Sequence, residues 1–305
     1  MIPLMKSIII VVSVFLSYTA CGQSNLEGIS KINGTNIYIN VKGKGDYLLL
    51  LHGGPGLNHS YFIPHLTELE KSFKVIYYDQ RACGKSATPS ADSISIKFLV
   101  DDIEAIRQKF KIQKLNILGH SWGALLAIHY ALQHPTEVNK MIMSNPSMLS
   151  REYDEEVAQL LKKNFTKEDS TAQAQIMSGG TLDRRKYEEL FLLSFKPSAY
   201  DKGNITKLNL NLPDNFGAAN NTLFAALMKD PALGQNLYDS LSALKFPVLI
   251  VHGSSDIIPF RSIERLNQQL PKSEVTIFKQ SGHFPFVEET ALYNSTVLKF
   301  LNVKK

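Results

Sequence analysis

The sequence of 305 residues lacks the features that mark several classes of protein. It has only two cysteines, Cys21 and Cys83, so a framework of several disulfides is excluded. Its 33 lysines and arginines are spread along the chain, and a net charge of +5 indicates no basic surface for nucleic acid. It contains no H-E-x-x-H or similar metal-binding pattern and no phosphate-binding loop. We therefore expect no nucleic acid, metal, cofactor or obligate protein partner.

Long hydrophobic runs are also missing, with one short exception at the N-terminus. Residues 7–16 carry no charge and follow Lys6. Such a run is too short to span a bilayer comfortably, but it is typical of a secretory signal. Ala20 and Gly22 are small, as cleavage after Gly22 would require. The sequence therefore predicts a signal peptide over 1–22.

The same segment also resembles a bacterial lipoprotein signal, in which Cys21 would become the lipid-bearing first residue. Tyr18 departs from that pattern, because an aliphatic residue usually stands three positions before the cysteine. Simple cleavage and an uncleaved membrane anchor are the alternatives. We expect a bacterial protein that is exported, either to the periplasm or to a membrane as a lipoprotein. We expect Cys21 to be lipidated or removed with the signal, in which case the mature chain can form no internal disulfide.

Hydrophobic residues, 44% of the chain, gather in short apolar runs that alternate with segments of helical periodicity. A hairpin comes first, with strands at 28–32 and 36–42 and a turn at Asn33-Gly34. The predicted buried strands are 47–53, 73–79, 115–119, 140–146, 246–253 and 274–279, and the predicted helices are 94–110, 122–133, 260–270 and 286–302. This order predicts an α/β fold whose mostly parallel sheet has helices on both faces.

The alternation of strands and helices stops between residues 147 and 243. This stretch is helical in character, is richer in Lys, Glu, Asp and Asn, and has no convincing buried strand. We interpret it as a helical lid inserted into the sheet domain. The predicted organisation is thus a first core half over 23–146, a lid over 147–243 and a second core half over 244–305.

A G-x-S-x-G pattern, Gly119-His120-Ser121-Trp122-Gly123, lies directly after one predicted strand and directly before a helix. On such a turn a serine hydroxyl stands clear of the backbone, and the glycines allow the chain to pack through the bend. The helix N-terminus also offers the Trp122 N–H to a developing oxyanion. The pattern predicts Ser121 as a nucleophile.

A nucleophilic serine needs a histidine base and an acid that orients it, here expected in the order serine, acid, histidine. Asp256 follows the predicted strand 246–253, and His283 follows the strand 274–279 and precedes the last helix. The other seven histidines precede the serine, or lie within the turn, on the following helix or at a strand end. The predicted triad is Ser121, Asp256 and His283.

The glycine-rich segment His52-Gly53-Gly54-Pro55-Gly56 follows the first long buried strand. Such a loop can present a second backbone N–H opposite the Trp122 N–H, and we expect it to be that of Gly54. Two such donors would bind the negatively charged oxygen of a tetrahedral intermediate.

Five segments together resemble the proline iminopeptidase group of α/β-hydrolases: HGGPG at 52–56, DQRACGKS at 79–86, GHSWG at 119–123, HGSSDIIP at 252–259 and SGHFPFVEE at 281–289. The resemblance covers both halves of the predicted sheet domain. It implies the α/β-hydrolase fold, the same triad and oxyanion donors, and release of an N-terminal residue, often proline, from small peptides.

Such peptidases hold the free amine of the substrate with carboxylates, largely from the lid. The predicted lid offers several acids as candidates, among them Glu152, Asp154, Glu155, Glu156, Glu188, Glu189 and Asp214, and none can be assigned to this role from the sequence. A carboxylesterase, or another acyl hydrolase on the same triad, would need no such acid and is the alternative. A non-catalytic binding protein on this scaffold is a third hypothesis, which the complete triad disfavours.

Overall fold

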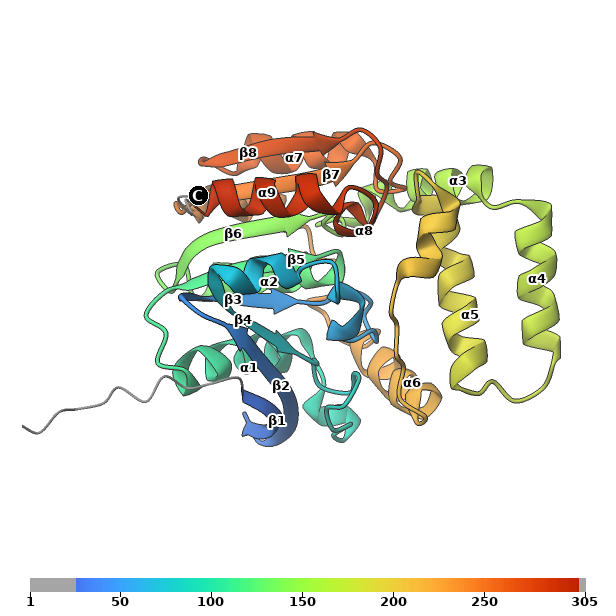
Figure 1. Ribbon diagram of the computed structural model, residues 1–305, viewed down its shortest axis with the longest axis horizontal. Helices are drawn as coiled ribbons and strands as arrows, with labels where there is room; N and C mark the ends of the chain where they lie inside the picture. Colours follow the sequence, from blue (N-terminus) through green and yellow to red (C-terminus); the bar gives the residue numbers. More distant parts are fainter. Residues whose placement is uncertain (1–25, 302–305) are drawn as a thin grey trace, which may run out of the picture.

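A computed structural model describes residues 26–301 and shows an eight-stranded sheet between two layers of helices (Figure 1). The order of strands across the sheet is β1-β2-β4-β3-β5-β6-β7-β8. Their bounds are β1 Leu26–Ile32, β2 Thr35–Gly43, β3 Asp46–Leu51, β4 Phe73–Tyr78, β5 Leu115–His120, β6 Val138–Ser144, β7 Val248–Gly253 and β8 Ser273–Phe278. The predicted signal peptide over 1–22, with Cys21, lies outside the described residues.

Strands β1 and β2 form the predicted hairpin. Asn33 and Gly34 at its turn both have positive φ, 43° and 79°, as a two-residue turn that follows the strand twist requires. The hairpin pairs antiparallel with β4, whereas every pair from β4 through β3, β5, β6 and β7 to β8 is parallel. The prediction of a mostly parallel sheet is confirmed.

The central strands of the sheet are buried on both faces, and β3 illustrates how. Leu49 and Leu51 belong to the hydrophobic cluster that α1, α2 and α7 cover, whereas Leu48 and Leu50 belong to the cluster that α8 and α9 cover. The helices are α1 Ile96–Lys109, α2 Trp122–Gln133, α7 Phe260–Gln269, α8 Pro285–Glu288 and α9 Thr290–Phe300. Because successive side chains enter opposite cores, these strands appear in the sequence as continuous apolar runs.

The prediction of one helix over 286–302 is wrong at Glu289. This residue has φ −126° and ψ 51° and separates α8 from α9. Its carboxylate turns back and accepts hydrogen bonds from the Gln280 N–H at 3.0 Å and the Ser281 hydroxyl at 2.7 Å. The helix is interrupted where this side chain anchors the preceding loop, which carries His283.

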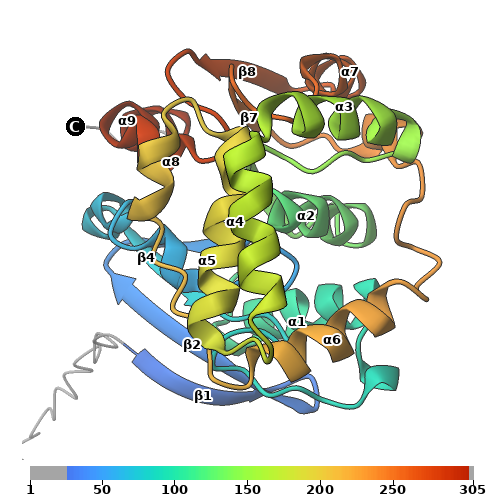
Figure 2. The ribbon, with the colours of Figure 1, turned by 90° about the vertical axis from the view of Figure 1, so that its right-hand side faces the viewer.

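Residues 147–243, which we continue to call the lid, lie mostly beyond the carboxyl ends of the parallel strands (Figure 1), and their last part, Tyr238–Ala243, packs against α2 and α7 on the way back to β7. Their α-helices are α3 Asp154–Asn164, α4 Lys167–Ser178, α5 Arg184–Phe195 and α6 Phe216–Leu227. In the view onto this end of the molecule, α4 and α5 stand in front of the sheet, α3 lies beside α7, and α6 lies beside α1 (Figure 2). Within the described residues, no helix has the length and apolar character needed to cross a membrane.

Candidate active site

Ser121 occupies a sharp turn between β5 and α2. Its φ of 54° and ψ of −118° lie in a region that non-glycine residues rarely adopt, and such strain is typical of functional sites. Its N–H donates to the Ser144 carbonyl at 3.0 Å, which fixes the turn to the end of β6. The Ser121 hydroxyl lies 3.5 Å from the Ser147 hydroxyl, and the residue is half-buried. These features place an accessible hydroxyl at the start of a helix.

Gly123 allows α2 to approach the end of β3. A Cβ at this position would overlap with the carbonyl oxygen of Leu51 and would also press on that of His52. Only a residue without a side chain permits this packing. The serine turn therefore lies directly against the start of the glycine-rich loop 52–56.

His283 and Asp256 are brought together at the same end of the sheet. His283 Nδ1 lies 2.9 and 3.0 Å from the two carboxylate oxygens of Asp256, whose side chain has no exposed surface. The His283 side chain remains 12% exposed. With Nδ1 held by the carboxylate, Nε2 is the nitrogen left for proton exchange with a substrate or nucleophile.

The surroundings of Asp256 favour its ionised form. Burial alone would raise the pKa of this carboxyl, but contacts with His283, then His252 and Asn145, outweigh burial and lower it. Asn145 Nδ2 donates to Asp256 at 2.7 Å and to the Gly282 carbonyl at 2.9 Å. The same amide thus connects the loop that carries the acid to the loop that carries the histidine.

His283 also lies beside the serine turn. Its carbonyl is 2.8 Å from Nε2 of His120, the residue before Ser121, and the two imidazole centroids are 4.9 Å apart. The His283 N–H donates to the Ser198 carbonyl of the lid at 2.6 Å. The structure therefore brings Asp256 and His283 into direct contact beside the Ser121 turn, whereas the one hydrogen-bond partner of the Ser121 hydroxyl among the described residues is Ser147.

The two predicted oxyanion donors lie on adjoining loops. Gly54 has φ +125°, is exposed, and within residues 26–301 its N–H makes no backbone hydrogen bond. The N–H of its neighbour Gly53 is already bound to the Tyr61 hydroxyl at 2.6 Å. Trp122 is the first residue of α2, where backbone N–H groups have no partner within the helix. Neither the Gly54 nor the Trp122 amide thus has a backbone hydrogen-bond acceptor among the described residues.

Most of the predicted lid acids are bound to the protein itself. Four pair with arginines, namely Glu152 with Arg265, Asp154 with Arg151, Glu156 with Arg261 and Asp214 with Arg184. Glu155 and Glu189 are exposed. Glu188, half-buried on α5, instead accepts the Leu212 N–H at 2.8 Å.

Three further residues at this place were not predicted from the sequence as site residues. Gln80 and Tyr61 contact the glycine-rich loop, and Asn145 contacts Asp256. Gln80 lies within DQRACGKS, one of the five segments that carry the family resemblance, and this motif was a signal for it. Arg81 of the motif pairs with Asp102, both side chains 1% exposed, in the core.

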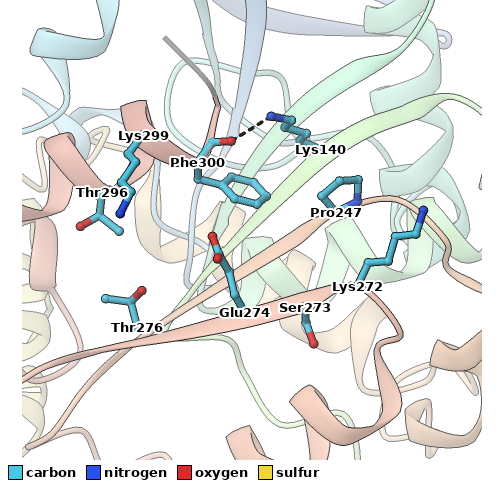
Figure 3. Close-up of a pocket in the computed structure, with 9 residues that line it drawn as sticks. All are labelled: Lys140, Pro247, Lys272, Ser273, Glu274, Thr276, Thr296, Lys299 and Phe300. Atoms are coloured by element: carbon cyan, nitrogen blue, oxygen red, sulfur yellow. Dashed lines mark hydrogen bonds between the residues drawn. The ribbon is translucent and has the colours of Figure 1, made fainter. Parts of the chain in front are cut away.

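A cavity of about 700 Å³ lies elsewhere, among Lys140, Pro247, Glu274, Phe300 and their neighbours (Figure 3). These residues lie near the beginnings of β6, β7 and β8, at the opposite end of the strands from His283. The Lys140 amine is bound to the Phe300 carbonyl at 2.9 Å. No group of three or more potential metal ligands occurs among the described residues.

Comparison with known proteins agrees with this geometry. The family model for the alpha/beta hydrolase fold matches residues 46–290. A proline iminopeptidase of Heyndrickxia coagulans is 28% identical over 90% of this chain and 98% of its own length. The crystal structure of a proline iminopeptidase from Mycobacterium smegmatis gives a TM-score of 0.66 at 20% identity, covering 90% of this chain and 97% of that one. An esterase from Exiguobacterium antarcticum gives 0.67 at 22% identity, covering 91% of this chain and all of that one. The chain belongs to the α/β-hydrolase family, with distant homology to proline iminopeptidases over most of its length.

Proposed function

We propose that this α/β-hydrolase is a serine hydrolase with Ser121 as nucleophile, His283 as general base and Asp256 as the acid that orients the histidine. The observation that carries the proposal is the contact of His283 Nδ1 with the buried Asp256 carboxylate, beside the strained turn of Ser121. The Gly54 and Trp122 amides would bind the oxyanion.

The chemistry follows from these positions. His283 Nε2 takes the Ser121 proton as the serine oxygen bonds to the substrate carbonyl carbon, and the carbonyl oxygen becomes an anion between the two amides. His283 then gives the proton to the leaving amine or alcohol as its bond to carbon breaks. Water, deprotonated by the same histidine, releases the acid and restores Ser121. Asp256 stays ionised throughout, as its lowered pKa favours.

The proposed activity is that of an aminopeptidase that releases N-terminal residues, proline foremost, from small peptides. Similarity to a proline iminopeptidase over 90% of the chain supports it. The free amine of such a substrate needs a carboxylate partner in a partly dry site. We propose Glu188, which is half-buried and pairs with no arginine among residues 26–301, whereas Glu155 and Glu189 are exposed. Glu188 lies on α5, where Phe191 and Phe195 follow it, and the Phe195 ring is 5.0 Å from that of Phe284, next to His283.

A carboxylesterase is the second candidate, and the lid acids are the observation that favours it. Four of the seven acids considered from the sequence are paired with arginines, so few of these candidates are free to bind an amine. An ester substrate has no ammonium group and therefore needs no carboxylate in the lid.

The test compares three substrates of the purified chain 23–305: a proline arylamide, its N-blocked form and a short-chain nitrophenyl ester. An aminopeptidase cleaves the free-amine arylamide at least about 100-fold faster than the N-blocked one. The blocked substrate has no ammonium group and cannot form the buried charge pair with the carboxylate of the enzyme. Ester cleavage without arylamide cleavage would replace the peptidase proposal by an esterase. Ser121→Ala is the control and should lower kcat by at least about 10⁴-fold with an unchanged unfolding curve. Full activity in this variant would refute the proposed nucleophile.

A further inference from the structure

The two loops proposed to bind the oxyanion are joined by two hydrogen-bonded bridges. The first passes through Gln80, which is 1% exposed. Its Nε2 donates to the His52 carbonyl at 2.8 Å, and its Oε1 accepts the Trp122 indole N–H at 3.0 Å. The Gln80 N–H also donates to His52 Nε2 at 3.0 Å. One amide side chain thus holds the first residue of the glycine-rich loop to the first residue of α2.

The second bridge passes through Tyr61 and His120, both buried. The Tyr61 hydroxyl accepts the Gly53 N–H at 2.6 Å and lies 2.9 Å from His120 Nδ1. The His283 carbonyl, 2.8 Å from His120 Nε2, can only accept, so Nε2 carries the ring proton and donates to it. In the neutral ring Nδ1 is an acceptor, so the Tyr61 hydroxyl donates its proton to Nδ1.

This second bridge requires a neutral His120. Burial, together with the neighbouring His283, lowers its pKa to about 3, so the ring is uncharged at neutral pH. The bridge therefore connects the glycine-rich loop, the serine turn and the backbone of His283 through side chains that do not change charge during turnover.

We propose that Gln80, Tyr61 and His120 are positioning residues that fix the separation of the Gly54 and Trp122 amides, so that the oxyanion site exists before substrate binds. The proposal rests on the proposed serine-hydrolase function. The two bridges hold residues on or next to the two donors. The Gln80 bridge contacts His52 and the Trp122 side chain, and the Tyr61 bridge contacts Gly53 and His120. Because an oxyanion site works by preorganisation, small displacements of its donors lower the rate more than they weaken substrate binding.

The test uses Gln80→Met, which keeps the length of the side chain but removes its amide, and Tyr61→Phe. Tyr77→Phe is the matched control, since Tyr77 is also buried and loses a hydroxyl that donates to Glu70 at 2.9 Å, outside the bridges. The probe is a fluorophosphonate, whose phosphoryl oxygen enters the oxyanion site, and mass spectrometry follows its attachment to Ser121. We expect each bridge variant to react about 10- to 100-fold more slowly and the control within about twofold of wild type.

A second readout separates positioning from a general loss of structure. An ester and its thiono analogue differ only in the atom that the two amides bind, and sulfur accepts hydrogen bonds more weakly than oxygen. The oxygen-to-sulfur ratio of kcat should fall in both bridge variants, with KM nearly constant, and should stay at the wild-type value in the control. Equal losses with both substrates, or unchanged labelling rates, would overturn the proposal. If the wild type is not labelled at Ser121 at all, the proposed nucleophile is wrong, and the positioning role falls with it. If wild type and bridge variants are labelled at equal rates, only the positioning role of the bridges is refuted.

Discussion

At the scale of single residues, the buried histidines link the site to stability. Burial lowers the pKa of His52 to about 4 and that of His120 to about 3, and both are fully enclosed next to the glycine-rich loop. In the unfolded chain a histidine binds its proton near pH 6.5. Between that pH and about 4 the unfolded state therefore holds protons that the folded state does not, so stability is complete above pH 6.5 and falls as the pH drops.

This difference predicts a pH-dependent effect of His120→Gln. Each such histidine contributes a slope of about 1.4 kcal/mol per pH unit to the free energy of unfolding between pH 6 and 4.5. The variant should be less stable than wild type at pH 7, because hydrogen bonds are lost, but its stability should decline less steeply on acidification. Urea unfolding at four pH values measures both slopes. Parallel slopes would show that His120 does not stay neutral in the fold.

The individual residues of the site differ in how well the sequence predicts them. Ser121, Asp256 and His283 each occupy a local pattern, because a nucleophile turn and two loops after strands have recognisable residues. Tyr61 and Asn145 have no such pattern, and Gln80 lies in a motif that does not reveal its contacts. Their roles arise from hydrogen bonds to residues distant in the chain, and those partners are known only once the sheet has been assembled.

At the scale of elements, the strands were the most predictable part and the lid the least. A strand buried on both faces, such as β3 or β7, must be apolar throughout, so its sequence is distinctive. The lid helices are short and partly exposed, and α4 exposes most of its residues, so periodicity predicts helical character but not their arrangement. The break at Glu289 was missed because its cause is a contact with the loop before α8.

The lid also carries the choice between peptidase and esterase. Glu188→Gln should lower kcat/KM for a free-amine proline arylamide by about 10- to 1000-fold, because the substrate ammonium loses a carboxylate partner. Hydrolysis of a nitrophenyl ester should change by less than about threefold. Glu189→Gln removes the same charge from the exposed neighbouring position and should alter neither rate. Equal rates for Glu188→Gln and Glu189→Gln on the arylamide would exclude Glu188 as the amine partner.

At the scale of the whole molecule, stability does not depend on cysteine chemistry. Cys83 is buried, and burial raises the pKa of its thiol, so the reactive thiolate is suppressed. The two hydrophobic clusters on the faces of the sheet hold the fold together instead. Such a chain is compatible with an oxidising compartment without needing a disulfide there.

The predicted lipid attachment would determine how the whole molecule lies at the membrane. Cys21 precedes Leu26, the first residue of the edge strand β1, by five residues, which span about 17 Å at most when extended. A lipid on Cys21 would therefore hold the sheet edge near the membrane, whereas the lid lies beyond the carboxyl ends of the parallel strands (Figure 1). Attachment at that edge leaves the approach of small substrates from the lid side open.

We therefore expect the full-length protein, produced in a bacterial host, to appear in the membrane fraction and Cys21→Ser to appear in the soluble periplasmic fraction. Both forms should have the same kcat/KM for a soluble substrate, within about twofold, because the anchored edge is remote from His283. Fractionation, mass spectrometry of the N-terminus and kinetics on both forms measure this. A Cys21→Ser variant that stays in the membrane would indicate an uncleaved anchor, and a wild type that is soluble with its N-terminus at Gln23 would indicate simple cleavage after Gly22.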